Sequence, residues 1–299
     1  MKNNKQIPFI KFSKFFLIFS GIIFSISILL LVFKGIKTSI DFQGGTIVNV
    51  SIRSDKHNLS FLREELSSKL EKSVSVVELQ SNDSTNNLII TTEYLSDEIE
   101  LNNILQQIYS DKYTIIGIES IGPKIGNELS KNARNAVIVS LLLIGLYITI
   151  RFDLSYSIGS ILALMHDLII TLGIFIIIDY EISIAIIAAL LTIVGYSLND
   201  TIVIYDRIRE NILSNPHRDK KLNINESLNQ TLNRTLITSI TTLIVVIVLF
   251  IYGGNVLQPF AFTLIIGVIL GTYSSLFVAS PVMLWLDNKI NIDTEKEEA

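Results

Sequence analysis

Six long apolar runs constrain this chain more than any other feature of its sequence. A helix that crosses a membrane needs roughly 20 predominantly apolar residues. Charged residues make up only 17% of the 299 residues, whereas soluble domains carry about 25%, so lipid must be the solvent for much of the chain. The sequence predicts transmembrane helices at residues 15–33, 133–150, 156–178, 182–205, 235–252 and 259–286.

The first apolar run follows a basic segment, as the core of a cleaved signal peptide does. A signal core spans about 7 to 15 residues and is followed by a small-x-small cleavage site. This run is longer and ends in Leu-Val-Phe-Lys at residues 31–34. We therefore interpret residues 15–33 as a retained membrane anchor.

Lysine and arginine are distributed unequally among the short segments between the apolar runs. Residues 1–14, the loop at Arg151 and the segment 206–234 are basic, whereas the loops 179–181 and 253–258 contain no Lys or Arg. Basic short loops remain in the cytoplasm. Both termini are therefore expected in the cytoplasm, with 206–234 as a cytoplasmic loop.

With the N-terminus in the cytoplasm, residues 34–132 follow the first helix and are expected on the outer side, as a domain with flanking linkers. Their lysines do not contradict this placement, because long translocated domains are exempt from the charge rule. Residues 133–286 contain helices two to six. The charged, apolar-poor segment 287–299 is expected to be a disordered cytoplasmic tail.

The external segment 34–132 alternates between strand and helix patterns. Apolar residues recur with period two in the strands and at three and four residues in the helices. The strands are 46–53, 73–79, 88–92 and 113–118, and the helical stripes begin at Leu59 and Leu101. This β-α-β-β-α-β order predicts a small α+β domain with the ferredoxin-like fold.

The external domain has no paired catalytic groups, no phosphate-binding loop and no spacing suited to metal ligands. The chain also has no cysteine, which excludes disulfides and thiol chemistry. We therefore expect no enzyme activity, no catalytic residue, no metal and no cofactor. An alternative role for the domain is to bind a polypeptide along a sheet edge.

Four polar residues interrupt the predicted membrane helices. His166 and Asp167 lie in the middle of the third helix, and Asn199 and Asp200 lie in the fourth. An aspartate at mid-bilayer costs at least about 2.5 kcal/mol, so ionisable residues there generally have a function.

The fifth predicted helix runs back from the cytoplasmic side and begins near Arg234, so Arg234 and Asp200 can share a depth. Thr231, Thr238 and either Thr241 or Thr242 add hydroxyls at helical spacing. A carboxylate can take up and release a proton, while an arginine favours the charged carboxylate and stays protonated itself. The pattern predicts a proton-binding site, with protons as the coupling ion.

Simpler interpretations exist for each of these residues. Threonines in membrane helices often bond their own backbone, Asp200 could be a neutral packing residue, and His166 could be a satisfied bundle histidine. Asp206 and Arg207 are expected at the membrane surface, paired with neighbours. Close helix packing is the simplest role for Gly145, Gly159, Gly173 and Gly267.

Residues 195–211 read Gly-Tyr-Ser-Leu-Asn-Asp-Thr-Ile-Val-Ile-Tyr-Asp-Arg-Ile-Arg-Glu-Asn and resemble a signature of the SecD/SecF family. Segments 41–46, 121–129 and 230–235 and the His166–Asp167 pair agree with this family. Ser39 departs from it, because a glycine is expected there. The matching motif positions are Asp41, Gly44, Gly45, Gly122, Pro123, Gly126, His166, Gly195, Asp206 and Arg207.

The resemblance implies the RND superfamily, with six helices as half of a twelve-helix unit. It implies the shorter, SecF-type subunit, because SecD relatives have a much longer external segment. The residues that match the family's proton pathway are Asp200 and Arg234, with Asn199 and Thr238 beside them and Asp167 at the third-helix acidic position.

The implied role is to complete protein export with the proton motive force after the SecA ATPase has acted. The implied partners are SecD, the SecYEG channel, YajC, YidC, SecA and the translocating preprotein, with membrane lipid and without nucleic acid. The implied location is the bacterial inner membrane, with residues 34–132 in the periplasm.

Two other functions remain open from the residues. One is an RND-type efflux component for lipid or small molecules, although the compact external domain lacks an insertion that would form a substrate cleft. The other is a passive assembly subunit in which Asp200 only packs. Gly35 and Gly122–Pro123 flank the external domain and are either hinges or simple terminators of helices and strands.

Overall fold

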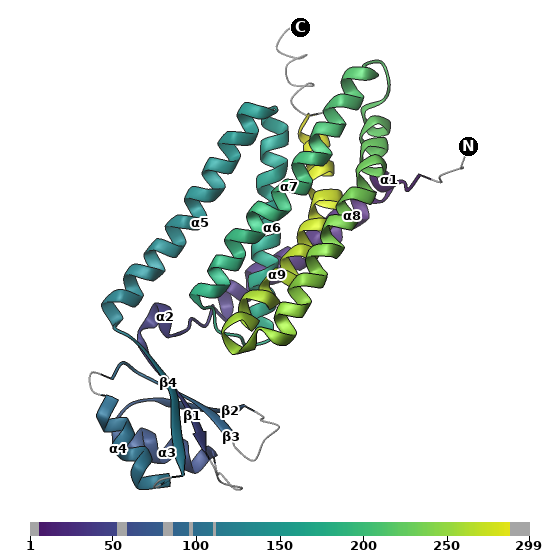
Figure 1. Cartoon of the computed structure of the whole chain (residues 1–299). Helices are drawn as coiled ribbons and strands as arrows, with labels where there is room; N and C mark the ends of the chain where they lie inside the picture. The colour runs from purple at the N-terminus through teal and green to yellow at the C-terminus, as the bar shows by residue number, and fades with distance from the viewer. Residues whose placement is uncertain (1–5, 53–58, 80–85, 96–97, 110–111, 288–299) are drawn as a thin grey trace. The chain divides into compact units, whose positions relative to one another are not determined.

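The computed structural model of the chain describes residues 6–52, 59–79, 86–95, 98–109 and 112–287. It divides into a helical unit, Met1–Lys37 with Asn135–Ala299, and an α+β unit, Thr38–Arg134 (Figure 1). A polar turn is expected at 81–87, between the strands 73–79 and 88–92; its residues 81–85 lie outside the described residues, as do all but the first residue of the predicted tail 287–299.

The described part of the chain contains six helices that are long and apolar enough to cross a membrane, as the sequence predicts. In three of them, α1, α5 and α8, at most 17% of the most apolar window is buried, so their apolar faces are open to lipid or to partners. The helices are α1 (Phe9–Phe33), α5 (Pro123–Arg151), α6 (Leu154–Ile177), α7 (Ile184–Ser214), α8 (Lys220–Tyr252) and α9 (Gly254–Ser274), which continues through a π-helical turn, η1 (Ser275–Ala279).

The segment 206–234 is not the loop that the sequence analysis expects. Helix α7 continues to Ser214 and α8 begins at Lys220, so only a short connection separates them. The side chain of Asp219 accepts the backbone N–H of Lys221 at 2.9 Å and caps α8. The loop was predicted because the segment is rich in charged residues. A helix, however, satisfies its own backbone hydrogen bonds and can therefore extend beyond the apolar region.

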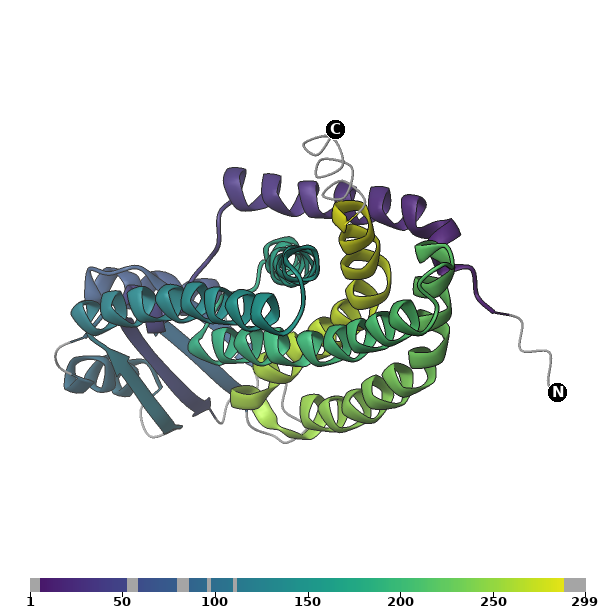
Figure 2. The ribbon, with the colours of Figure 1, turned by 90° about the horizontal axis from the view of Figure 1, so that it is seen from above.

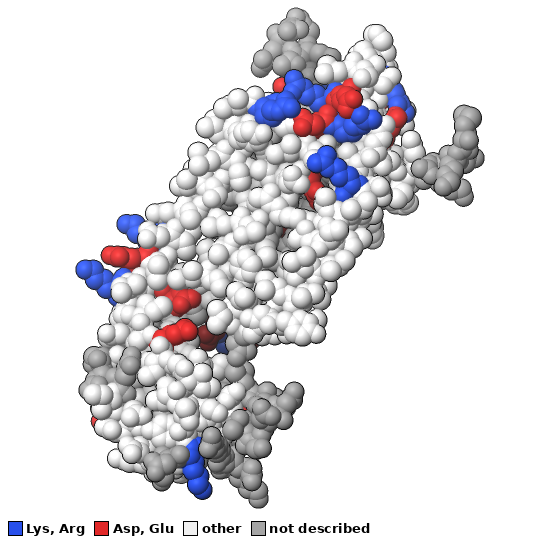
Figure 3. All heavy atoms as spheres, in the orientation of Figure 1, with Lys and Arg blue, Asp and Glu red and all other residues white. Residues whose placement is uncertain are grey.

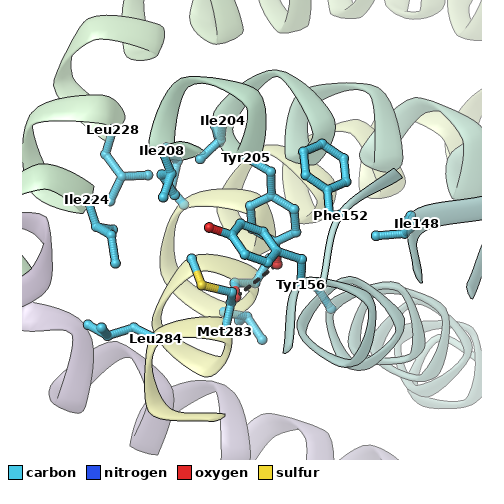
Figure 4. Packing of buried hydrophobic residues seen from close by; sticks show 14 of the residues in the cluster. Ile148, Phe152, Tyr156, Ile204, Tyr205, Ile208, Ile224, Leu228, Met283 and Leu284 are labelled. Carbon is cyan, nitrogen blue, oxygen red and sulfur yellow. Dashed lines mark hydrogen bonds between the residues drawn. The ribbon is translucent and has the colours of Figure 1, made fainter. Parts of the chain in front are cut away.

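Aromatic side chains pack α6 and α7 together at one end of the helical unit (Figure 4). The rings of Tyr156 and Tyr205 meet edge to face, with centroids 4.9 Å apart, and Phe152 contacts the ring of Tyr205 at 6.0 Å. Helix α1 runs along one side of the unit (Figure 2) and packs against α6 and η1. The buried interior of the unit is therefore centred on α6, α7 and α9.

Charged side chains of the helical unit lie near its two ends: in Figure 3 they gather where α7 meets α8, and Lys34, Lys37 and Asp179 lie together at the opposite end. The group where α7 meets α8 includes ion pairs between Arg151 and Asp206 and between Lys220 and Asp287. Between the ends, the face seen in Figure 3 is largely uncharged. An apolar belt with charged ends is the surface that a bilayer requires.

The turn between α6 and α7 is fixed to the end of α1. The backbone N–H of Ile182 donates to the carbonyl of Lys37 at 2.8 Å. A hydrogen bond from Lys37, together with the nearby charge of Lys34, holds the pKa of the Asp179 carboxyl below its ordinary value. Asp179 has φ +58°, a left-handed conformation that aspartate tolerates better than most residues.

The α+β unit has, in its described part, a four-stranded antiparallel sheet of order β2-β3-β1-β4. On β1, Val48, Val50 and Ile52 alternate into the core and are at most 1% exposed. The strand order confirms the predicted ferredoxin-like fold. The elements are β1 (Gly45–Ile52), α3 (Leu59–Leu70), β2 (Val74–Leu79), β3 (Asn86–Thr92), α4 (Glu98–Tyr109) and β4 (Tyr113–Ile121).

A short helix, α2 (Ile40–Gln43), precedes β1 and contains the motif residue Asp41. The hydroxyl of Ser39 accepts the backbone N–H of Asp41 at 3.3 Å. Ser39 is therefore the N-cap of α2, a position where serine is favoured. This capping role accounts for a serine where the family resemblance leads one to expect glycine.

Two of the predicted motif blocks pack against each other inside the α+β unit. Gly44 and Gly45 have φ of +79° and +157°, and a Cβ on Gly44 would lie 2.8 Å from Cα of Pro123. A Cβ on Gly126 would lie 2.9 Å from the carbonyl oxygen of Phe42. These glycines let the start of α5 lie directly against α2.

Replacing Gly126 by Ala is expected to destabilise the α+β unit by about 1–3 kcal/mol, the usual cost of overpacking. The added methyl group would meet backbone atoms, which cannot move aside as a side chain can. The temperature at which the unit becomes protease-sensitive in the full chain should fall. Gly117→Ala is the matched control, because nothing lies within 4 Å of its added Cβ; equal behaviour of the two variants would contradict this account.

The predicted hinge glycines end or precede helices. Gly35 has φ +73° and follows α1, where its N–H donates to the carbonyl of Leu30 at 3.2 Å. Gly122 precedes Pro123, which is the first residue of α5, a position that proline favours. The geometry supports the alternative in which these residues terminate secondary structure.

Candidate functional site

Asp167 lies in the middle of α6 and is completely buried, with 0% of its surface exposed. Its Oδ2 accepts hydrogen bonds from the hydroxyls of Ser197 on α7 at 2.9 Å and Ser274 on α9 at 2.7 Å. Its Oδ1 lies 3.0 Å from Nδ1 of His166. One carboxyl group thus joins the three central helices of the unit.

More hydroxyl groups extend this cluster along α7 and α9. The hydroxyls of Thr201 and Ser275 lie 2.9 Å apart, and both also bond the backbone carbonyl of Ser197. All three residues are at most 2% exposed. The cluster therefore forms a continuous polar core from Asp167 to the turn of α7 that carries Asp200.

The last membrane helix changes its geometry next to the cluster. Ser275–Ala279 forms a π-helical turn, and the hydroxyl of Ser280 donates to the carbonyl of Ser275 at 3.1 Å. The hydroxyl of Tyr205 donates to the carbonyl of Ala279 at 3.2 Å (Figure 4). π-Turns occur frequently at functional sites, and here side chains satisfy the carbonyls that the turn exposes.

Glycines bring the central helices close enough for these short contacts. A Cβ on Gly271 would lie 2.8 Å from Cβ of Ser197, and one on Gly267 would lie 2.1 Å from Cδ1 of Ile193. The predicted packing role of Gly267 is thereby confirmed. Equally close neighbours surround the other three predicted packing glycines, Gly145, Gly159 and Gly173.

His166 lies in the same buried region, but only one of its two ring nitrogens has a hydrogen-bond partner among the described residues. Its ring lies between those of Phe24 and Tyr273, with centroids 6.4 and 6.1 Å away. Nε2 is buried and has no hydrogen-bond partner among the described residues. The interpretation of His166 as a bundle histidine accounts for Nδ1, which lies against Asp167, but not for Nε2.

Asp200 is buried to 4% exposure on α7, yet its Oδ2 has no hydrogen-bond partner in the described part of the chain. The charge of Arg234 on α8 acts on it, so the structure brings the predicted pair within electrostatic range. No hydrogen bond joins the two side chains within the described residues. Asp200 is thus a buried carboxyl group with free acceptor capacity and a basic residue nearby.

Three of the predicted site residues lie on the outside of the helical unit. Asn199 and Gly195 on α7 and Arg234 on α8 are all exposed. Nothing lies within 4 Å of a Cβ added to Gly195. An amide and a guanidinium group are unusual on the outside of a membrane helix bundle.

The threonine stripe on α8 bonds mainly to its own helix. The hydroxyl of Thr238 donates to the carbonyls of Arg234 and Thr235 at 3.1 and 2.9 Å. Thr231 and Thr241 make the same kind of bond to carbonyls three and four residues earlier. This is the local role of threonine in membrane helices, so the stripe alone does not identify a proton path.

Asp206 and Arg207 lie on a partly exposed side of α7 and pair with neighbours, as predicted. Asp206 accepts a hydrogen bond from Arg151 at 3.1 Å, with both side chains 47% exposed. Arg207 pairs with Glu210 on its own helix and donates to Gln230 on α8. These contacts fix the positions of the ends of α7 and α8.

The sequence analysis missed the hydroxyl shell around Asp167. Ser197 and Thr201 are four residues apart and therefore on one face of α7, and Ser274 and Ser275 adjoin each other in an apolar run. That spacing was a usable signal. It was weak because serine and threonine occur in membrane helices without any special role.

Comparison with known proteins identifies relatives over almost the whole chain. The family model described as protein export membrane protein SecD/SecF, C-terminal, matches residues 100–289. A protein translocase subunit SecF from Calditerrivibrio nitroreducens is 39% identical over 292 residues, covering 94% of each chain. One from Helicobacter pylori is 33% identical over 291 residues, covering 95% of this chain and 88% of the relative.

Solved structures agree with these relatives. The crystal structure of SecDF from Thermus thermophilus, described as a translocon-associated membrane protein, matches with a TM-score of 0.85 and 35% identity. A SecDF structure in a super-membrane-facing form matches with a TM-score of 0.73 and 36% identity. The matches cover 96% and 99% of this chain but only 40% of each SecDF chain.

Proposed function

Because the chain belongs to the SecD/SecF family and is a SecF-type subunit of the Sec protein translocase, we propose that it uses proton flow to drive preprotein export. The observation that carries this proposal is Asp200. It is a buried carboxyl group whose Oδ2 has no partner among the described residues, and it lies within electrostatic range of Arg234.

Proton coupling follows from the chemistry of that pair. A carboxyl group in a membrane is most stable when neutral, and an arginine beside it favours the charged form. Small changes in the distance between Asp200 and Arg234 would therefore switch proton uptake to proton release. Each proton that crosses a 100 mV potential supplies about 2.3 kcal/mol, enough to bias the α+β unit between two arrangements.

We further propose that a SecD subunit completes the site. The solved SecDF chains contain more than twice the length that this chain covers, which supports a second half contributed by another subunit. Asn199, Gly195 and Arg234 are exposed on the helical unit and form the surface that SecD would cover. In that complex, the six helices are half of a twelve-helix unit.

The proposed setting is the bacterial inner membrane. The charged end where α7 meets α8 would face the cytoplasm, as the positive-inside rule requires, and the α+β unit would face the periplasm. Further proposed partners are the SecYEG channel, SecA, YajC, YidC and the preprotein. The alternative of small-molecule efflux has less support, because the curated relatives described above are translocase subunits.

Cysteine crosslinking tests the proposed interface directly, because the natural chain has no cysteine. Asn199→Cys should form a disulfide with cysteines scanned along the membrane helices of a coexpressed SecD. Leu142→Cys on α5 is the control, since it is 68% exposed on another helix of the unit. Crosslinking from Leu142 but not from Asn199 would assign SecD to a different face.

A further inference from the structure

A pocket of about 680 Å³ opens at the end of the helical unit that carries the connection between α7 and α8. Three segments that are distant in sequence form its walls: the start of α1, the start of α8 and the last turns of the final membrane helix. The backbone N–H of Ile10 donates to Asn225 at 3.3 Å and joins two of these walls. The pocket is thus part of the helix packing and not a gap in a loop.

The lining of the pocket combines apolar and basic side chains. Leu17, Leu222, Pro281, Leu284 and Trp285 supply apolar surface, and Trp285 is 61% exposed. The charged lining residues are Lys11, Lys14, Lys221 and Asp219.

Positive charge predominates in the pocket, because three lysines and one carboxylate line it. The one lining carboxylate, Asp219, caps the start of α8 by accepting the N–H of Lys221. Across the described residues, Lys11, Lys14 and Lys221 form no ion pair, whereas neighbouring Lys220 pairs with Asp287 at 2.6 Å. Three lysines therefore line an apolar groove without forming an ion pair with any residue in the part of the chain that the structure describes.

We propose that this pocket binds one anionic phospholipid of the cytoplasmic leaflet. The lysines Lys11, Lys14 and Lys221 hold its phosphate, and an acyl chain lies along Leu222 and Trp285. Basic pockets between membrane helices recognise anionic headgroups, and tryptophan favours the depth of the headgroups. A bound lipid would link α1 to α8, the helix that carries Arg234.

Trp285 is the only tryptophan in the chain, so its fluorescence reports on this pocket alone. The full-length chain, reconstituted in phosphatidylcholine vesicles, is titrated with brominated phosphatidylglycerol or with brominated phosphatidylcholine. Bromine quenches tryptophan on contact. The anionic lipid should reach half-maximal quenching at a mole fraction at least about fivefold lower, because three lysines attract it. Equal quenching by both lipids would overturn the proposal.

Charge variants distinguish a built site from general attraction to a basic surface. Lys11→Gln, Lys14→Gln and Lys221→Gln together should abolish the lipid preference, whereas Arg at all three positions should preserve it. Arg209→Gln removes a positive charge from α7 at the same end of the unit but outside the pocket, and it should not change the lipid preference. A preference that survives the triple Gln variant, or that Arg209→Gln reduces equally, would show surface attraction only.

Two further measurements complete the test. Lys112→Gln, Lys124→Gln and Lys131→Gln remove the same number of charges from exposed lysines of the α+β unit and should leave the preference unchanged. Glycerol phosphate in solution should not displace the brominated lipid, because it lacks the acyl chain. Displacement at millimolar concentration would identify the pocket as a site for a soluble phosphate and contradict lipid binding.

Discussion

Replacing Asp200 by Asn is expected to abolish the stimulation of protein export by the proton motive force while leaving the chain folded and assembled. Asparagine preserves the shape of the side chain but cannot take up or release a proton at neutral pH. Because Oδ2 of Asp200 has no partner in the described structure, the substitution breaks no hydrogen bond of that atom. Preprotein translocation into energised inverted membrane vesicles measures the effect.

The variant should export no more preprotein with a membrane potential than without one, beyond the contribution of the channel and SecA alone. Asp153→Asn is the control, because it removes an exposed carboxylate at the start of α6 that makes no capping hydrogen bond. The control should retain full stimulation. If Asp200→Asn also retained it, Asp200 would be a packing residue and the proposed coupling would be wrong.

Replacing Asp167 by Leu is expected to destabilise the helical unit by about 3 kcal/mol or more. The substitution leaves Ser197, Ser274 and His166 without their shared acceptor, and each buried polar group left unpaired costs about 1–3 kcal/mol. Asp167→Asn retains an acceptor oxygen and should cost roughly 1 kcal/mol. Thermal unfolding of the full chain in detergent measures both changes.

Ser160→Ala provides a reference for a single buried hydroxyl. Ser160 is on the same helix and 1% exposed, and its hydroxyl bonds the backbone carbonyl of Tyr156 at 2.9 Å and also interacts with Tyr205. Its removal should cost less than about 1 kcal/mol. If Asp167→Leu were no more destabilising than Ser160→Ala, the cluster around Asp167 would not be what holds α6, α7 and α9 together.

Much of the fold follows from periodicity and hydropathy. Apolar runs identify the six helices because a bilayer demands length and apolarity together, and alternating Val48, Val50 and Ile52 identify a central strand. Helix ends do not follow from the same signals. Residues 206–214 include four charged side chains but are helical, because helix formation depends on backbone bonding while membrane burial depends on the side chains.

The buried carboxylates of the site could be predicted from the sequence, because a charged residue is costly in an apolar segment and therefore stands out. Asp167 and Asp200 are conspicuous in an apolar sequence, and both are buried. Which of them lies at the centre of a network was not predictable. That depends on glycines such as Gly271, which let α9 approach Ser197, and on the π-turn that follows Ser274.

Which of the site residues are exposed could not be predicted from the sequence either. Asn199 and Asp200 are neighbours in the chain, yet one faces out of the helical unit and the other faces in. Adjacent helical residues point about 100° apart, so a motif can serve the interior and an interface together. The proposed SecD contact depends on this division, which only the packing of α7 against α8 and α9 reveals.

Proton flux is the most direct test of the account. The chain and SecD are reconstituted together in vesicles that enclose a pH-sensitive dye, and a potential is imposed across the membrane. The wild-type complex should acidify or alkalise the lumen at least about tenfold faster than the Asp200→Asn complex, because the pathway requires a titratable carboxyl group. Equal flux through both complexes would contradict the claim that Asp200 carries the proton.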